Sequence, residues 1–131
     1  MSLQKKELGA QGEEIAVSYL KSRGYRILER NYRIRLGEID IIAEQGADLV
    51  FIEVKTRSDT LFGSPFESLT FAKQRQLSKV ALEYINKRDW HNRPARFDVV
   101  GILFKAGNSR QLKDAGIELM QNAFDLCYGN E

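Results

Sequence analysis

Hydrophobic residues recur at three- and four-residue steps in two long segments, which is the spacing of one helix face. The first segment covers residues 5–23 and is followed by Gly24, a residue that commonly ends helices. The second covers residues 70–88. The apolar positions of the two faces are Leu8, Ile15, Ala16, Tyr19 and Leu20, then Leu77, Val80, Ala81, Tyr84 and Ile85. The pattern predicts two amphipathic helices.

Between these helices the hydrophobic period shortens to two, as in half-buried strands. Residues 37–56 predict a β-hairpin with its turn at Gly46-Ala47, because acidic and apolar residues alternate before the turn and β-branched residues dominate after it. The other predicted strands are 25–33, 96–104 and 116–120, with a turn at Gly107-Asn108, and Ser64–Glu67 has the pattern of a helix start. The order α-β-β-β-α-β-β predicts an α/β, mixed α+β fold with one sheet and helices packed against it.

Composition limits the classes of protein. The chain has 131 residues, of which 43% are hydrophobic and 29% charged, so we expect a single globular domain over 1–131. No apolar run is long enough for a membrane span and no signal-peptide pattern opens the chain, so we expect no membrane contact and a cytoplasmic location. The single cysteine, Cys127, excludes an internal disulfide framework.

The net charge of +2 is too small to indicate nucleic-acid binding by itself. Five arginines nevertheless fall close together, at Arg23, Arg26, Arg30, Arg33 and Arg35. They form either a stripe that contacts phosphates or a solvated edge of a strand and helix.

Acidic residues in the hairpin are the strongest chemical signal. A turn at Gly46-Ala47 places Asp40 opposite Glu53 and Glu38 opposite Lys55, and opposed residues have Cβ atoms ~4.5–5.5 Å apart. Two facing carboxylates need neutralisation, which Mg²⁺ or Mn²⁺ provides through hard oxygen ligands. The alternative is a solvent-exposed polar face on which Lys55 pairs with an acid.

The apolar run 49–52 argues against that alternative, because it indicates a strand buried on both faces. Glu13 borders the apolar face of the first helix. It could therefore reach the same cluster as a ligand or a holder of water, or be an ordinary residue at the flank of the helix.

These residues match a known pattern. Asp40, a twelve-residue spacer and Glu53-Val54-Lys55 resemble the core of the PD-(D/E)xK nuclease superfamily, although Ile39 stands where that motif has proline. The wider chain, from about residue 9 to 124, resembles the bacterial YraN-like family of predicted endonucleases, which is related to archaeal Holliday junction resolvases. The strings that carry this resemblance are Gly12-Glu13, Asn31-Tyr32-Arg33, Gly37-Glu38-Ile39-Asp40-Ile41-Ile42-Ala43, Val50-Phe51-Ile52-Glu53-Val54-Lys55-Thr56-Arg57 and Arg96-Phe97-Asp98-Val99-Val100.

The resemblance implies a restriction-endonuclease-like core and a Mg²⁺- or Mn²⁺-dependent endonuclease acting on DNA, branched DNA included, as a homodimer. Asp40, Glu53 and the main-chain carbonyl of Val54 would bind the metal, and Lys55 would orient or deprotonate the attacking water or stabilise developing charge. Glu13 would correspond to the glutamate on the resolvase helix. The alternatives are a nucleic-acid-binding module of the same fold without turnover and a protein-interaction adaptor.

Basic side chains near the motif are candidate contacts for the nucleic acid. These are Arg33, Arg35, Arg57 and Lys73, with Arg75 and Lys79 as further phosphate contacts. A solvated helix face is the alternative for Lys73, Arg75 and Lys79. Asp98, between Phe97 and Val99, is expected to be structural rather than catalytic.

Overall fold

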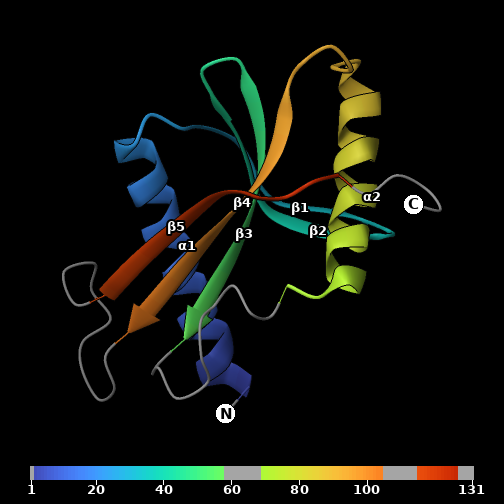
Figure 1. Ribbon diagram of the computed structural model, residues 1–131. Coiled ribbons are helices and arrows are strands. Elements are labelled where there is room, and N and C mark those ends of the chain that lie inside the picture. The colour runs from blue at the N-terminus through green and yellow to red at the C-terminus, as the bar shows by residue number, and fades with distance from the viewer. Residues whose placement is uncertain (1, 58–68, 105–114, 127–131) are drawn as a thin grey trace.

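Two helices cover opposite faces of one twisted sheet (Figure 1). The structure, a computed structural model, describes residues 2–57, 69–104 and 115–126. The elements are α1 (Ser2–Ser22), β1 (Arg26–Ile34), β2 (Gly37–Gln45), β3 (Asp48–Arg57), α2 (Phe71–Arg88), β4 (Ala95–Phe104) and β5 (Ala115–Phe124). The predicted order α-β-β-β-α-β-β is confirmed. Within these ranges neither helix has the length and apolar character to cross a membrane.

The five strands lie in the order in which they occur in the chain. β1, β2 and β3 form an antiparallel meander, β4 runs parallel to β3, and β5 returns antiparallel to β4. A parallel neighbour requires a crossover connection, which contains α2. Because the strand order is β1-β2-β3-β4-β5, β3 is the central strand, as the apolar run 49–52 predicts.

Each helix closes its own core against one face of the sheet. The residues packed with α1 include Ile41, Ala43, Val50, Ile52, Val100 and Ile102. Those packed with α2 include Ile39, Ile42, Leu49, Phe51 and Phe97. Neighbouring residues of β3 thus contribute to different cores, because side chains alternate between the faces of a strand.

The predicted hairpin register is confirmed. β2 and β3 pair from Gln45–Asp48 next to the turn to Ile41–Ile52 at the far end. Gly46 in the turn has φ 60°, in the left-handed region that glycine adopts without strain. The ladder ends at Ile41–Ile52, so the next residues outward in this register, Asp40 and Glu53, lie where the two strands part.

A close helix–strand contact places the first half of α1 beside the end of β3. A Cβ atom added at Gly12 would overlap the side chain of Thr56, with its Cγ2 only 3.1 Å away. Glycine at this position allows the two backbones to approach closely. The next residue along the helix, Glu13, is thereby brought to the same end of the sheet as Asp40.

The last strand is longer than predicted, because it spans 115–124 rather than 116–120. Its pairing with β4 shifts between Phe97 and Val99, and Asn122 has φ 54° at that irregularity. The polar residues of this bulge ended the predicted strand too early. The predicted helix start at 64–67, the turn at 107–108 and Cys127 lie outside the described residues.

Candidate active site

Asp40 occupies the gap where β2 leaves β3. Its Oδ2 accepts a hydrogen bond of 2.8 Å from the main-chain N–H of Val54. The carboxylate of Asp40 thus takes the place of the backbone acceptor that would continue the β2–β3 ladder. In a strand, the N–H and C=O of one residue point to the same side. The carbonyl of Val54 therefore faces the same gap, which is the orientation that its expected role as a ligand requires.

Glu53 lies beside this gap, and its acidic side chain is buried. The residue is 8% exposed, and its Oε2 lies 3.4 Å from Lys55 Nζ and 3.7 Å from Lys73 Nζ. The first contact places Glu53 and Lys55 on one face of β3, as predicted, and the second brings in a residue of α2. Two ammonium groups therefore share one carboxylate.

Glu38 does not pair with Lys55 as the hairpin pattern predicted. Its Oε1 instead lies 2.7 Å from Nη2 of Arg33 across the β1–β2 pair. The physical reason is the parting of the strands, since the β2–β3 ladder has already ended at Ile41–Ile52.

Glu13 stands on the α1 side of the cluster. Its Oε1 accepts hydrogen bonds from Asn31 Nδ2 at 3.0 Å and from Arg30 Nη2 at 3.1 Å. Asn31 lies between Arg30 and Tyr32, which pair with Ile41 and Ile39 on either side of Asp40. It has φ 53°, a conformation that asparagine tolerates better than most residues. Glu13, Asn31 and Asp40 therefore lie in neighbouring elements at one end of the sheet.

The charges around Asp40 make its ionised form unfavourable. Burial is the largest cause, and the charge of Glu53 is the next. Together with the charges of Glu13 and Glu38, these two effects raise the pKa of Asp40 from 3.8 to about 7, although the hydrogen bond from the Val54 N–H acts to lower it. Each of the three surrounding acids has a basic partner. Among the described residues, Asp40 has none. It is therefore the carboxylate in this cluster that a cation would stabilise most.

The donor set suits a hard divalent cation. Within the described ranges there is no cluster of three or more acidic, histidine or cysteine side chains arranged around one point. Mg²⁺ does not need one, because it keeps several waters and binds through one or two carboxylates. Asp40, Glu53 and the carbonyl of Val54 would supply three oxygens and leave positions open for water and phosphate.

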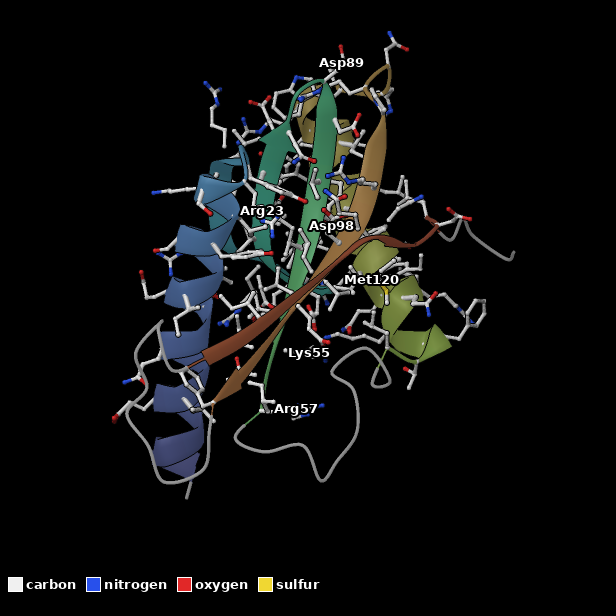
Figure 2. The ribbon with its side chains drawn as sticks, turned by 60° about the vertical axis from the view of Figure 1, so that its left-hand side comes forward. Arg23, Lys55, Arg57, Asp89, Asp98 and Met120 are labelled. Atoms are coloured by element: carbon white, nitrogen blue, oxygen red, sulfur yellow. The ribbon has the colours of Figure 1, made fainter. Side chains whose placement is uncertain are left out.

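The predicted nucleic-acid contacts lie in different surroundings. Arg33 is ion-paired with Glu38, whereas Lys73 lies next to Glu53. Arg57 follows Lys55 along β3, and Figure 2 shows both toward the carboxyl end of the strand. Arg35 is exposed at the tip of the β1–β2 hairpin.

The predicted arginine stripe is largely neutralised by neighbouring acids. Arg26 pairs with Glu44, Arg30 with Glu13 and Glu14, and Arg33 with Glu38. These pairs favour the solvated edge over the phosphate-contacting stripe.

Comparison with known sequences places the chain in a family. The pattern of the family described as "Uncharacterised protein family UPF0102" matches residues 12–102. The chain is 48% identical to a UPF0102 protein of Geobacter metallireducens, covering 98% of this chain and 100% of the relative. It is 50% identical to one of Geotalea uraniireducens, covering 94% and 93%, and 48% identical to one of Clostridium botulinum, covering 92% and 96%. The chain belongs to UPF0102, which confirms the resemblance to YraN-like proteins.

Two contacts of this site were not predicted from the sequence. Asn31 donates to Glu13, and Lys73 reaches Glu53 from α2. An asparagine inside a predicted strand was the available signal for the first, because asparagine tolerates positive φ. The second depends on how α2 lies against the sheet, which helical periodicity does not determine.

Proposed function

We propose that this protein is a metal-dependent endonuclease that hydrolyses phosphodiester bonds in DNA. The observation that carries the proposal is Asp40, a part-buried carboxylate beside Glu53 that has a backbone N–H but, among the residues that the structure describes, no basic side chain as a partner. A purely structural acid would be expected to have a cationic partner. A site for a divalent cation explains why this one does not.

The residues of the chain divide the chemistry among them. A bound Mg²⁺ or Mn²⁺ would supply activated water and neutralise charge on the non-bridging oxygens of a phosphodiester. Asp40, Glu53 and the Val54 carbonyl would hold the ion. Lys55 Nζ would orient the attacking water, accept its proton or stabilise developing charge at the phosphate. Glu13, held by Asn31, would hold a second water.

Branched DNA is the substrate that the junction-resolvase resemblance favours. Two strands of a two-fold junction are cut by two active sites, so we propose that the protein acts as a homodimer. Light scattering at high protein concentration tests this part of the proposal. A monomer would contradict junction resolution and leave the hydrolysis of other DNA open.

Melting curves with and without Mg²⁺ or Mn²⁺ test the site before a substrate is chosen. The wild type should be stabilised by the metal through mass action, and Asp40→Asn much less. Lys55→Ala should keep the metal-induced shift, because Lys55 acts on water or phosphate. Equal shifts in wild type and Asp40→Asn would overturn the metal site.

Cleavage assays then test the activity with branched, flapped, single-stranded and linear DNA. Asp40→Asn and Lys55→Ala should both lose metal-dependent cleavage. DNA binding by Asp40→Asn should persist or tighten, since a negative charge near phosphate is removed. Binding by the wild type without cleavage of any substrate would instead favour a nucleic-acid-binding module.

A further inference from the structure

A groove runs between the tip of the β1–β2 hairpin and the first half of α2. It has a volume of about 600 Å³ and is lined by Leu36, Ala72, Lys73, Arg75, Gln76 and Lys79. The Nε2 of Gln76 donates a hydrogen bond of 3.0 Å to the carbonyl of Leu36. This bond ties the two walls together, so the groove exists before any ligand binds.

The charged side chains of the described residues that line the groove are all positive. Its lining, as far as the described residues form it, contains Lys73, Arg75 and Lys79 and no acidic residue. The first acidic residue along α2 is Glu83, and it forms an ion pair of 4.0 Å with Lys87. Over the described ranges, neither Arg75 nor Lys79 has an acid within ion-pair distance.

A second depression of similar volume, about 600 Å³, shows the contrast. It is lined by residues 21 and 25–30, and it includes Glu29. Its arginines are neutralised, because Arg26 pairs with Glu44 and Arg30 with two glutamates of α1. The groove along α2 therefore carries an excess of positive charge that the second depression lacks.

Exposed apolar side chains lie beside these cations. Leu36 is 51% and Phe71 58% exposed, and they are two of three large hydrophobic side chains exposed in the described residues. The guanidinium carbon of Arg75 lies 5.7 Å from the centre of the Phe71 ring. An aromatic ring beside cations is the combination on which unpaired bases stack while their phosphates are neutralised.

The groove is continuous with the candidate active site. Lys73 lines it and also lies 3.7 Å from Glu53 through its Nζ. We propose that the groove binds a single-stranded segment of nucleic acid, with backbone phosphates on Arg75 and Lys79 and a base on Phe71. The direction of the strand toward Glu53 rests on the proposed nuclease function, whereas binding in the groove does not.

Fluorescence anisotropy in EDTA tests the binding without cleavage. The probes are a labelled oligothymidine of about 15 nucleotides and a duplex of equal length, over a range of salt concentrations. Arg75→Ala/Lys79→Ala should weaken binding of the single strand about tenfold and reduce the salt slope by about 1.4, at ~0.7 per phosphate contact. Arg26→Ala/Lys87→Ala removes the same charge outside the groove and should change binding by less than about twofold.

Phe71→Ala tests the choice of a single strand. It should weaken oligothymidine binding about tenfold and leave duplex binding unchanged, and Phe71→Trp should restore the affinity. Melting curves are expected to show that all variants fold, because the substituted side chains lie at the surface. Duplex preference by the wild type, or no effect of Phe71→Ala, would overturn the proposal.

The outcomes separate this proposal from the nuclease proposal. Metal-dependent cleavage with equal binding by the groove and control variants overturns the groove alone. Specific loss of oligothymidine binding in the groove variants, with no cleavage by the wild type, supports the groove and counts against the nuclease. Where cleavage occurs, the groove variants should raise KM and leave kcat unchanged.

Discussion

Asp98 on β4 and Asp40 on β2 are both carboxylates removed from bulk water, but the sheet gives them different partners. Asp98 is 1% exposed and accepts hydrogen bonds from Tyr25 Oη at 2.7 Å, Arg96 Nε at 3.0 Å and the N–H of Asn122 at 2.9 Å. From the described part of the chain, Asp40 accepts one hydrogen bond, which the backbone N–H of Val54 donates. Hydrogen bonds and an ion pair within the chain compensate the burial of Asp98, whereas a single backbone N–H compensates the burial of Asp40 only in part.

The two surroundings also shift pKa values in different residues. Around Asp98 two partners are shifted: burial lowers the pKa of Arg96, but hydrogen bonds with Asp98 and Tyr25 outweigh this and raise it, and burial raises the pKa of Tyr25. At the other site the carboxyl group itself is shifted, to a pKa of about 7. A fully satisfied carboxylate stabilises the fold, whereas a partly satisfied one retains affinity for a proton or a cation. The comparison therefore assigns a structural role to Asp98 and supports a binding role for Asp40.

The largest expected effect is at Asp98. Asp98→Ala should lower the free energy of unfolding by about 2–4 kcal/mol, because it removes one of the two acids paired with the part-buried Arg96 and leaves Tyr25 Oη without this acceptor. Urea denaturation measures this, with the exposed Glu118→Gln as control. A loss below about 1 kcal/mol would show that the network does not stabilise the fold and would remove the basis of the comparison.

Asp40→Asn should have the opposite sign, and its effect should depend on pH. The folded-state pKa of about 7 lies above the ordinary 3.8, so the stability contributed by protonated Asp40 is present below about pH 4 and is lost as pH rises through 7. Asp40→Asn does not lose this stability, because the asparagine side chain does not ionise. In EDTA it should gain about 2 kcal/mol over the wild type between pH 4 and pH 8, roughly half of what 1.36 kcal/mol per pKa unit allows, because the group keeps some solvent contact. A pH-independent difference would contradict the raised pKa.

The two regions also differ in how far the sequence predicted them. Alternation of side chains and the turn at Gly46 determined the hairpin register, so the adjacency of Asp40 and Glu53 could be predicted from local rules. The partners of Asp98 come from the connection between α1 and β1, where Tyr25 lies, and from β5 as well as β4. No local period connects elements that far apart in the chain, so Asp98 could be expected to be structural but its partners could not be named.

The helical side of the candidate site shows the same limit. The periodicity of α1 placed Glu13 at the border of the apolar face, but it did not reveal that Gly12 packs against Thr56. The lysine that reaches Glu53 from α2 depends on the packing of that helix on the sheet. Local patterns thus predicted the strands of the site, and tertiary packing determined which helical residues reach it.

A smaller effect is expected at the helix–strand contact. Gly12→Ala should lower the free energy of unfolding by about 1–2 kcal/mol, since overpacking against Thr56 outweighs the gain in helix propensity. Gly9→Ala on the same helix meets nothing within 4 Å and should be neutral or stabilising by up to about 1 kcal/mol. Thermal melts of both variants give the comparison.

Cleavage by Gly12→Ala should fall as well, because the shift of α1 displaces Glu13 from Asn31. Equal stability of the two variants would contradict the close contact.

The smallest effect on stability is expected at Glu13, where function and stability separate most clearly. The Arg30–Glu13 pair has side-chain exposures of 35% and 15%, and pairs of this kind contribute less than about 1 kcal/mol. Glu13→Gln keeps an oxygen for Arg30 and Asn31 and removes one of the charges that raise the pKa of Asp40. We therefore expect a change in unfolding free energy within about 0.5 kcal/mol and a smaller pH dependence of stability than in the wild type.

If Glu13 holds a water at the site, cleavage by Glu13→Gln should fall at least about tenfold. The control is Glu14→Gln, because Glu14 also contacts Arg30 but is exposed, and this variant should cleave normally. Normal cleavage by Glu13→Gln would restrict the active site to Asp40, Glu53 and Lys55.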